Sequence, residues 1–69
     1  MKLNEKKEFF AYSGIIEKEE NSWVLGLGCC LAISELAARA FAANDFLTQH
    51  EDGKIISLAV LKIPTAEVH

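Results

Sequence analysis

Residues 54–63 have the sequence KIISLAVLKI, and this stretch carries the clearest structural signal in the chain. Ser57 is the only polar residue between its two lysines, so both alternating sets of positions are apolar. Side chains of a strand point alternately to its two sides, and such a run is typical of a strand that is covered on both. We therefore predict a strand over Lys54–Ile63 that stops before Pro64, which has no backbone N–H to donate.

The residues before this stretch predict two more strands. Phe9–Ile16 alternates between a stronger and a weaker apolar face. The polar segment 17–22 is typical of a hairpin loop, and Trp23–Leu27 is expected to form the second strand. The residues expected to face the core are Phe10, Tyr12 and Ile16 in the first strand and Trp23, Leu25 and Leu27 in the second.

A helix is expected from about Leu31 or Ser34 to about His50, because strong helix formers dominate this segment. At about 100° per residue, one apolar stripe runs along the helix and is predicted to face the core. The members of this stripe are Ile33, Leu36, Ala37, Ala40, Phe41, Asn44 and Leu47. A second apolar group is expected on the side away from the core and consists of Ala38, Ala42 and Phe46.

These segments follow one another as strand, strand, helix and strand. A right-handed crossover carries the chain from the second strand over the first to the third. We therefore predict an α+β fold, a small two-layer ββαβ domain in which one helix packs on one face of a three-stranded antiparallel sheet of order 2-1-3. A single domain is expected over residues 1–69, with a flexible start at 1–7 and a loose tail at 65–69.

The predicted fold leaves an apolar surface uncovered. One helix covers only one face of a sheet, yet the first and third strands are apolar on both faces. Such a face on a small protein marks an interface. We expect it to meet a second copy in a homodimer; the alternatives are an obligate partner protein and a covering loop or tail. The predicted interface residues are Phe9, Ile15, Val24, Phe46, Ile55, Ala59, Leu61 and Ile63.

Length and composition favour the same interpretation. The chain has 69 residues, and a chain of this size buries only roughly 60% of its unfolded surface. Hydrophobic residues nevertheless make up 51% of it. The net charge of −3 disfavours non-specific binding to nucleic acid. The charged start and the lack of a long apolar run predict a cytoplasmic protein with no membrane segment.

No pattern in the sequence predicts a catalytic residue, a cofactor or a metal site. Cys29 and Cys30 are adjacent, where a disulfide would be strained, and are interpreted as two small buried apolar residues. The glycines of 26–28 are interpreted as easing a tight turn into the helix, because the third glycine position of a phosphate-binding turn holds Leu31. Residues 50–52, which are His, Glu and Asp, point in different directions and make a poor metal site.

The segment Glu17–Val24 resembles the acidic hairpin of HicB-type antitoxins, and the order of strands and helix is the same. The longer loop that this family has before its helix is missing between Leu25 and Ser34. Small acidic phage inhibitors, anti-CRISPR proteins among them, are similar in size and layout but have no common motif to match. No family is assigned on these grounds.

The sequence therefore predicts a small non-enzymatic protein-interaction module, a regulator or inhibitor of the mobile-element or phage type. The alternative is an antitoxin-like regulator that binds nucleic acid or a small ligand at the Gly26–Gly28 turn. An enzyme whose site is assembled across a dimer is the third and least favoured hypothesis.

Overall fold

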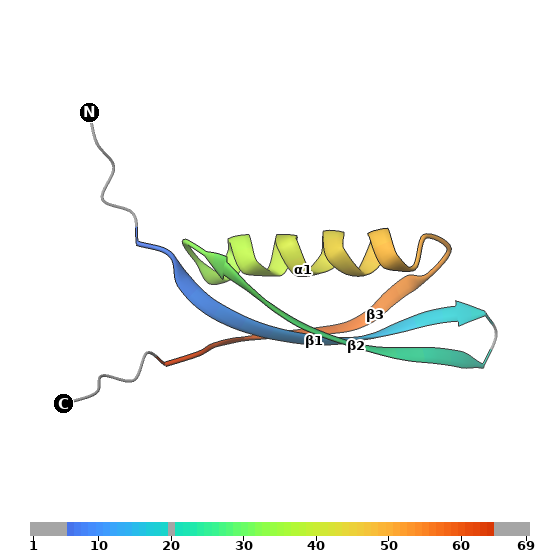
Figure 1. Cartoon of the computed structure of the whole chain (residues 1–69). Helices are drawn as coiled ribbons and strands as arrows, with labels where there is room; N and C mark the ends of the chain where they lie inside the picture. The colour runs from blue at the N-terminus through green and yellow to red at the C-terminus, as the bar shows by residue number, and fades with distance from the viewer. Residues whose placement is uncertain (1–5, 20, 65–69) are drawn as a thin grey trace.

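The computed structural model of the chain describes residues 6–19 and 21–64 (Figure 1). The elements are β1 (Glu8–Glu19), β2 (Ser22–Ala32), α1 (Glu35–Gln49) and β3 (Lys54–Lys62). The strands are antiparallel in the order β2-β1-β3, and α1 lies over one face of the sheet. The predicted ββαβ fold is confirmed. Residues 1–5 of the flexible start expected at 1–7 lie outside the described residues, as does the loose tail expected at 65–69.

β1 and β2 form a hairpin that is longer than predicted. Its pairing begins with Glu8 opposite Ala32 and continues to Glu19 opposite Ser22. Asn21, in the turn, adopts the left-handed conformation with a φ of 62°, which Asn tolerates better than most residues. Glu17, Lys18 and Glu19, which were predicted to lie in a loop, therefore belong to β1.

The core lies between α1 and the sheet. Its buried apolar residues are Phe10, Tyr12 and Ile16 of β1, Cys30 and Ala32 of β2, and Ala38, Ala42 and Phe46 of α1. The face predicted for β1 is thus confirmed. Ser34 caps the helix, because its Oγ accepts a hydrogen bond from the N–H of Ala37 at 3.1 Å. Arg39 ties α1 to β3 by donating to the carbonyl of Leu58 at 3.2 Å.

The helix faces the sheet with the stripe opposite to the predicted one. Phe46, expected on the far side, is only 2% exposed, whereas Leu36 of the predicted core stripe is 77% exposed. Both stripes are apolar, so hydrophobicity does not decide between them. The available space decides which stripe is buried. The ring of Phe46 lies over Gly14 and Gly26, where an added Cβ would come within 2.8 Å and 2.6 Å of ring carbons.

The faces of β2 are likewise reversed relative to the prediction. Gly26 and Gly28 face α1, and an added Cβ on Gly28 would lie 2.7 Å from the ring of Tyr12. Val24 belongs to the same set of positions and also faces the helix side. The predicted turn at Gly26–Gly28 is wrong, because β2 continues to Ala32.

A β-bulge changes the faces of β3. Ile15 pairs with Ser57, but the next residue, Ile16, pairs with Ile55, so Ile56 is an extra residue in β3. The bulge turns Ile55 toward the core, against which it packs. Strict alternation had placed Ile55 on the outer side, and that prediction is wrong, since alternation along a sequence does not reveal an inserted residue.

Candidate interaction surface

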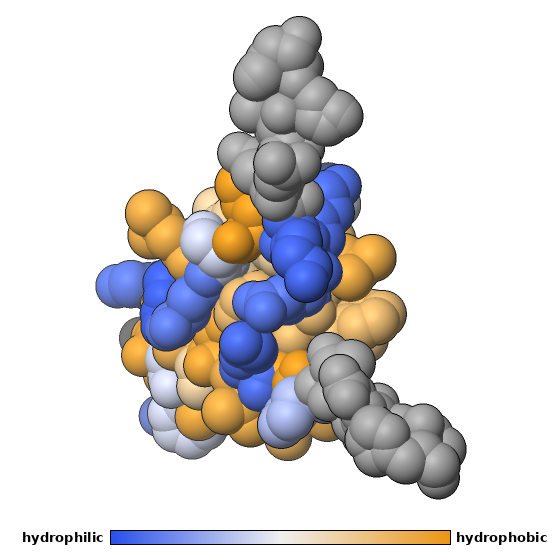
Figure 2. Space-filling model, turned by 90° about the vertical axis from the view of Figure 1, so that its left-hand side faces the viewer, coloured by the Kyte–Doolittle hydropathy of each residue, from blue (hydrophilic) through white to orange (hydrophobic). Residues whose placement is uncertain are grey.

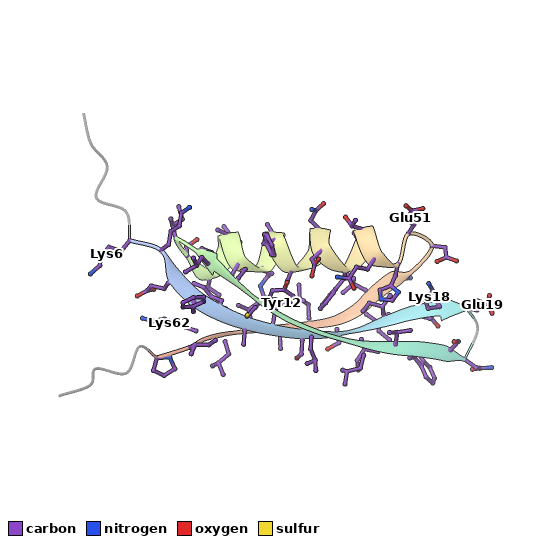
Figure 3. The ribbon with its side chains drawn as sticks, viewed as in Figure 1. Lys6, Tyr12, Lys18, Glu19, Glu51 and Lys62 are labelled. Atoms are coloured by element: carbon purple, nitrogen blue, oxygen red, sulfur yellow. The ribbon has the colours of Figure 1, made fainter. Side chains whose placement is uncertain are left out.

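The face of the sheet that points away from α1, here called the open face, is covered by large apolar side chains. They are Phe9 and Ile15 of β1, Trp23, Leu25, Leu27 and Leu31 of β2, and Leu61 and Ile63 at the end of β3. Each is between 38% and 72% exposed. Most side chains below the sheet in Figure 3 consist of carbon alone. Figure 2, which looks along the strands from the start of β1, shows hydrophobic residues dominating the lower side.

The open face has a ridge and a hollow. The ridge follows β2, where Leu25 and Leu27 project from neighbouring positions of the open face; Leu31 lies beyond Cys29 on the same face. The hollow has a volume of about 200 Å³ and lies over the middle of β1 and β3. Small residues form its floor and two leucines its walls; it is lined by Ala11, Tyr12, Ser13, Leu27, Ala59 and Leu61. The middle of the surface is therefore uneven, because Leu25 and Leu27 of β2 lie in the same rows as the small residues Ser57 and Ala59 of β3.

The two cysteines have different environments. Cys30 belongs to the core, whereas Cys29 is exposed on the open face opposite Ala11, and both thiols are free. Burial, followed by the proximity of Cys29, raises the pKa of the Cys30 thiol. The interpretation of both as buried residues is wrong for Cys29, because adjacent residues of a strand point to opposite sides.

Five of the eight predicted interface residues lie on the open face, namely Phe9, Ile15, Ala59, Leu61 and Ile63. The other three, Val24, Ile55 and Phe46, lie on the side covered by α1. Trp23, Leu25 and Leu27 of β2 also lie on the open face, although they were predicted to face the core. The signal that could have placed them correctly is the spacing of Gly26 and Gly28, because two glycines two residues apart leave room for large rings on one side of a strand.

The two ends of the sheet differ in charge (Figure 3). We call the end where β1 begins the basic end; its charged residues are Lys6, Lys7, Glu8 and Lys62. The opposite end, the acidic end, carries Glu17, Lys18, Glu19, Glu51, Asp52 and Lys54. Lys62 pairs with Glu8 at 3.2 Å, and Lys18 pairs with Asp52 at 3.2 Å. The hydrogen bond from Lys18 lowers the pKa of Asp52. These charges lie at the two ends of the open face and leave its centre apolar.

A polar pair holds α1 against the sheet. The Tyr12 hydroxyl donates to Asp45 Oδ2 at 2.9 Å, and Gln49 donates to Asp45 Oδ1 at 3.0 Å. Burial and then this hydrogen bond raise the pKa of Tyr12 to about 12. The contact therefore favours a neutral phenol. It connects α1 to β1 in addition to their apolar contacts.

Within residues 6–19 and 21–64, no three His, Cys, Asp or Glu side chains gather closely enough to hold a metal ion. In the part of the chain that the structure describes, no helix is both long enough and apolar enough to cross a membrane. In comparisons with family models, curated proteins and solved structures, none matched the chain. What the protein does is therefore inferred from its own residues.

Proposed function

We propose that this chain is a non-enzymatic protein-interaction module whose working surface is the open face. The observation that carries the proposal is the distribution of large apolar residues between the two faces of the sheet. On the covered side, three of the eight core residues are alanines. The open face, by contrast, presents eight large apolar residues to solvent. Contiguous apolar surface of this kind on a small protein is typical of an interface.

The area of the open face supports this proposal. A large apolar side chain has on the order of 200 Å² of accessible surface. Eight such residues at 38–72% exposure therefore present on the order of 900 Å². One side of a stable protein–protein interface buries about 800 Å². The open face is thus large enough to form one side of such an interface without help from the rest of the molecule.

The role we propose for such a module is that of a regulator or inhibitor whose open face binds another polypeptide, a second copy of the chain included. We do not propose ligand binding at Gly26–Gly28, because these glycines lie in the middle of β2 under the rings of Phe46 and Tyr12. A phosphate group could not approach their backbone from that side. The antitoxin-like alternative that depended on a turn there loses its structural basis.

The proposal is tested by site-specific photo-cross-linking in cells that produce the full chain. A benzophenone side chain replaces Leu27 on the open face, and in a matched variant it replaces Leu36, the most exposed leucine of α1. We expect polypeptide adducts from position 27, identified by mass spectrometry as a second copy or another protein, and few from position 36. The proposal would be contradicted if position 27 gave no adducts, or no more adducts than position 36, while circular dichroism of the purified variant showed that it is folded.

A further inference from the structure

We infer that the occupant of the open face is a second copy of this chain, packed face to face around a twofold axis that runs parallel to β1. The inference rests on the proposed function and names its partner. Its basis is the arrangement of large and small residues on β2 and β3, which the pairing with β1 aligns in rows across the sheet.

Three successive rows cross the middle of the open face. Ser13 pairs with Leu27 on one side and with Ala59 on the other. In the row on the side of the acidic end, Ile15 lies between Leu25 and Ser57; in the row on the side of the basic end, Ala11 lies between Cys29 and Leu61. Each row therefore has one large residue and one small residue on the two outer strands.

A twofold axis along β1 exchanges β2 and β3 between the two facing sheets. In these three rows, each β2 residue then meets the β3 residue of its own row in the other copy. Leu27 comes to lie over Ala59 of the other copy, Leu25 over Ser57, and Cys29 under Leu61. The ridge of each copy thus enters the hollow of the other, and both hollows are filled at once. Shape complementarity of this kind is what a well-packed interface requires.

The opposite orientation, with the axis across the strands, packs less well. It would place β2 over β2, so that ridge meets ridge and Leu27 meets its own copy. Both hollows, each of about 200 Å³, would remain empty. Unfilled apolar space is costly because the residues that line it lose their packing contacts. We therefore assign the axis along β1.

The assigned orientation brings like ends together, the basic end against the basic end and the acidic end against the acidic end. This repulsion is weak. Lys62 and Lys18 are already paired with Glu8 and Asp52 within each copy. Exposed charges are also screened beyond about 8 Å at physiological ionic strength. Packing at the centre of the face therefore decides the orientation.

A size-swap experiment on the full chain tests the inference by light scattering. The wild type is expected to have twice the chain mass at micromolar concentration. Leu27→Ala empties the hollow and Ala59→Leu overfills it, so each is expected to weaken dimerisation at least about tenfold. The double variant L27A/A59L restores the complementary pair and is expected to recover the dimer. The mismatched control L27A/S57L exchanges sizes between different rows and should not recover it.

Several outcomes would overturn the inference. A wild-type monomer at all concentrations would do so, and it would leave the proposed function standing if position 27 still cross-links to another protein. Dimers that withstand both single substitutions, or an equal recovery in the mismatched control, would contradict the assigned axis. A mass that keeps rising with concentration would contradict a closed twofold pair. Leu27 is 72% exposed in the single chain, so its truncation leaves the fold intact, which circular dichroism checks.

Discussion

The ring of Phe46 lies against the backbone of Gly26, where an added Cβ would stand 2.6 Å from Cε1 of the ring. The same ring covers Gly14, and its edge meets the ring of Tyr12 with centroids 5.4 Å apart. One aromatic side chain of α1 therefore fills a gap that two glycines leave in the sheet. This contact decides which side of the helix, and which sides of β1 and β2, are buried.

Gly26→Ala is expected to lower the free energy of unfolding by about 1–3 kcal/mol, because the methyl group and the Phe46 ring compete for the same space. Urea unfolding followed by circular dichroism measures the change. The double variant G26A/F46L is expected to lose less than the sum of its two single variants, since the smaller side chain makes room for the methyl group. Strictly additive losses would show that the two residues do not share this space.

The element order and the buried face of β1 could be predicted from the sequence. Phe10, Tyr12 and Ile16 form the stronger apolar set there, because the alternate set includes Ala11 and Ser13. The helix rotation could not be predicted in the same way, since the stripes that contain Leu36 and Phe46 are both apolar. Their choice depends on contacts with Gly14 and Gly26, which are distant in sequence.

The open face was only partly predictable for the same physical reason. Leu25 and Leu27 have the hydrophobicity of core residues, and only Gly26 and Gly28, which alternate with them, show that the other side of β2 accommodates rings. On β3, the bulge at Ile56 shifts Ile55 inward, and neither residue is of a type that would indicate a bulge in the sequence. The existence of an uncovered face could be predicted, because one helix cannot cover two apolar faces of a sheet. Which residues belong to that face could not be predicted, because this depends on the register of the strands.

The environment of Tyr12 leads us to expect that the folded chain loses stability at high pH. Its pKa is raised from 10.0 to about 12 in the folded chain, first by burial and then by the hydrogen bond to Asp45. Above pH 10 the unfolded chain loses this proton while the folded chain keeps it, so stability falls as the pH rises from about 10 to about 12. Below pH 10 both states are protonated and Tyr12 adds no pH dependence.

Tyr12→Phe removes this titration and leaves Asp45 its hydrogen bond from Gln49. The variant is expected to lose about 1 kcal/mol at neutral pH, the usual contribution of one hydrogen bond. Its decline between pH 10 and 12 should be shallower than that of the wild type, while lysine titration affects both alike. Urea midpoints at several pH values give the comparison, and parallel curves would show that Tyr12 is not the group responsible.

The two cysteines are expected to differ in reactivity toward iodoacetamide. Cys29 is exposed on the open face, whereas Cys30 is buried and has a raised pKa, so little of its thiolate is available. In dilute protein we expect Cys29 to react at least about tenfold faster. Mass spectrometry of the variants Cys29→Ser and Cys30→Ser assigns each rate. Similar rates for the two thiols would mean that the faces of β2 are not as described.

Dimerisation is expected to strengthen modestly as sodium chloride is raised, because the assigned orientation places like-charged ends together and salt screens their repulsion. Sedimentation equilibrium at a few salt concentrations measures the dissociation constant. An axis across the strands would instead bring the basic end against the acidic end, and salt would then weaken the dimer. The sign of the salt effect thus reports on the orientation without any substitution.

Trp23, the single tryptophan of the chain, tests the central claim most directly. It is 57% exposed on the open face of one copy, in the row that ends at Lys54. A second copy on this face would partly cover its indole ring. The measurement is tryptophan emission and acrylamide quenching of the unmodified protein from nanomolar to hundreds of micromolar concentration. A shift of the emission to shorter wavelength with reduced quenching, parallel to the increase in mass, is the predicted result; water-exposed emission and full quenching at every concentration would contradict it.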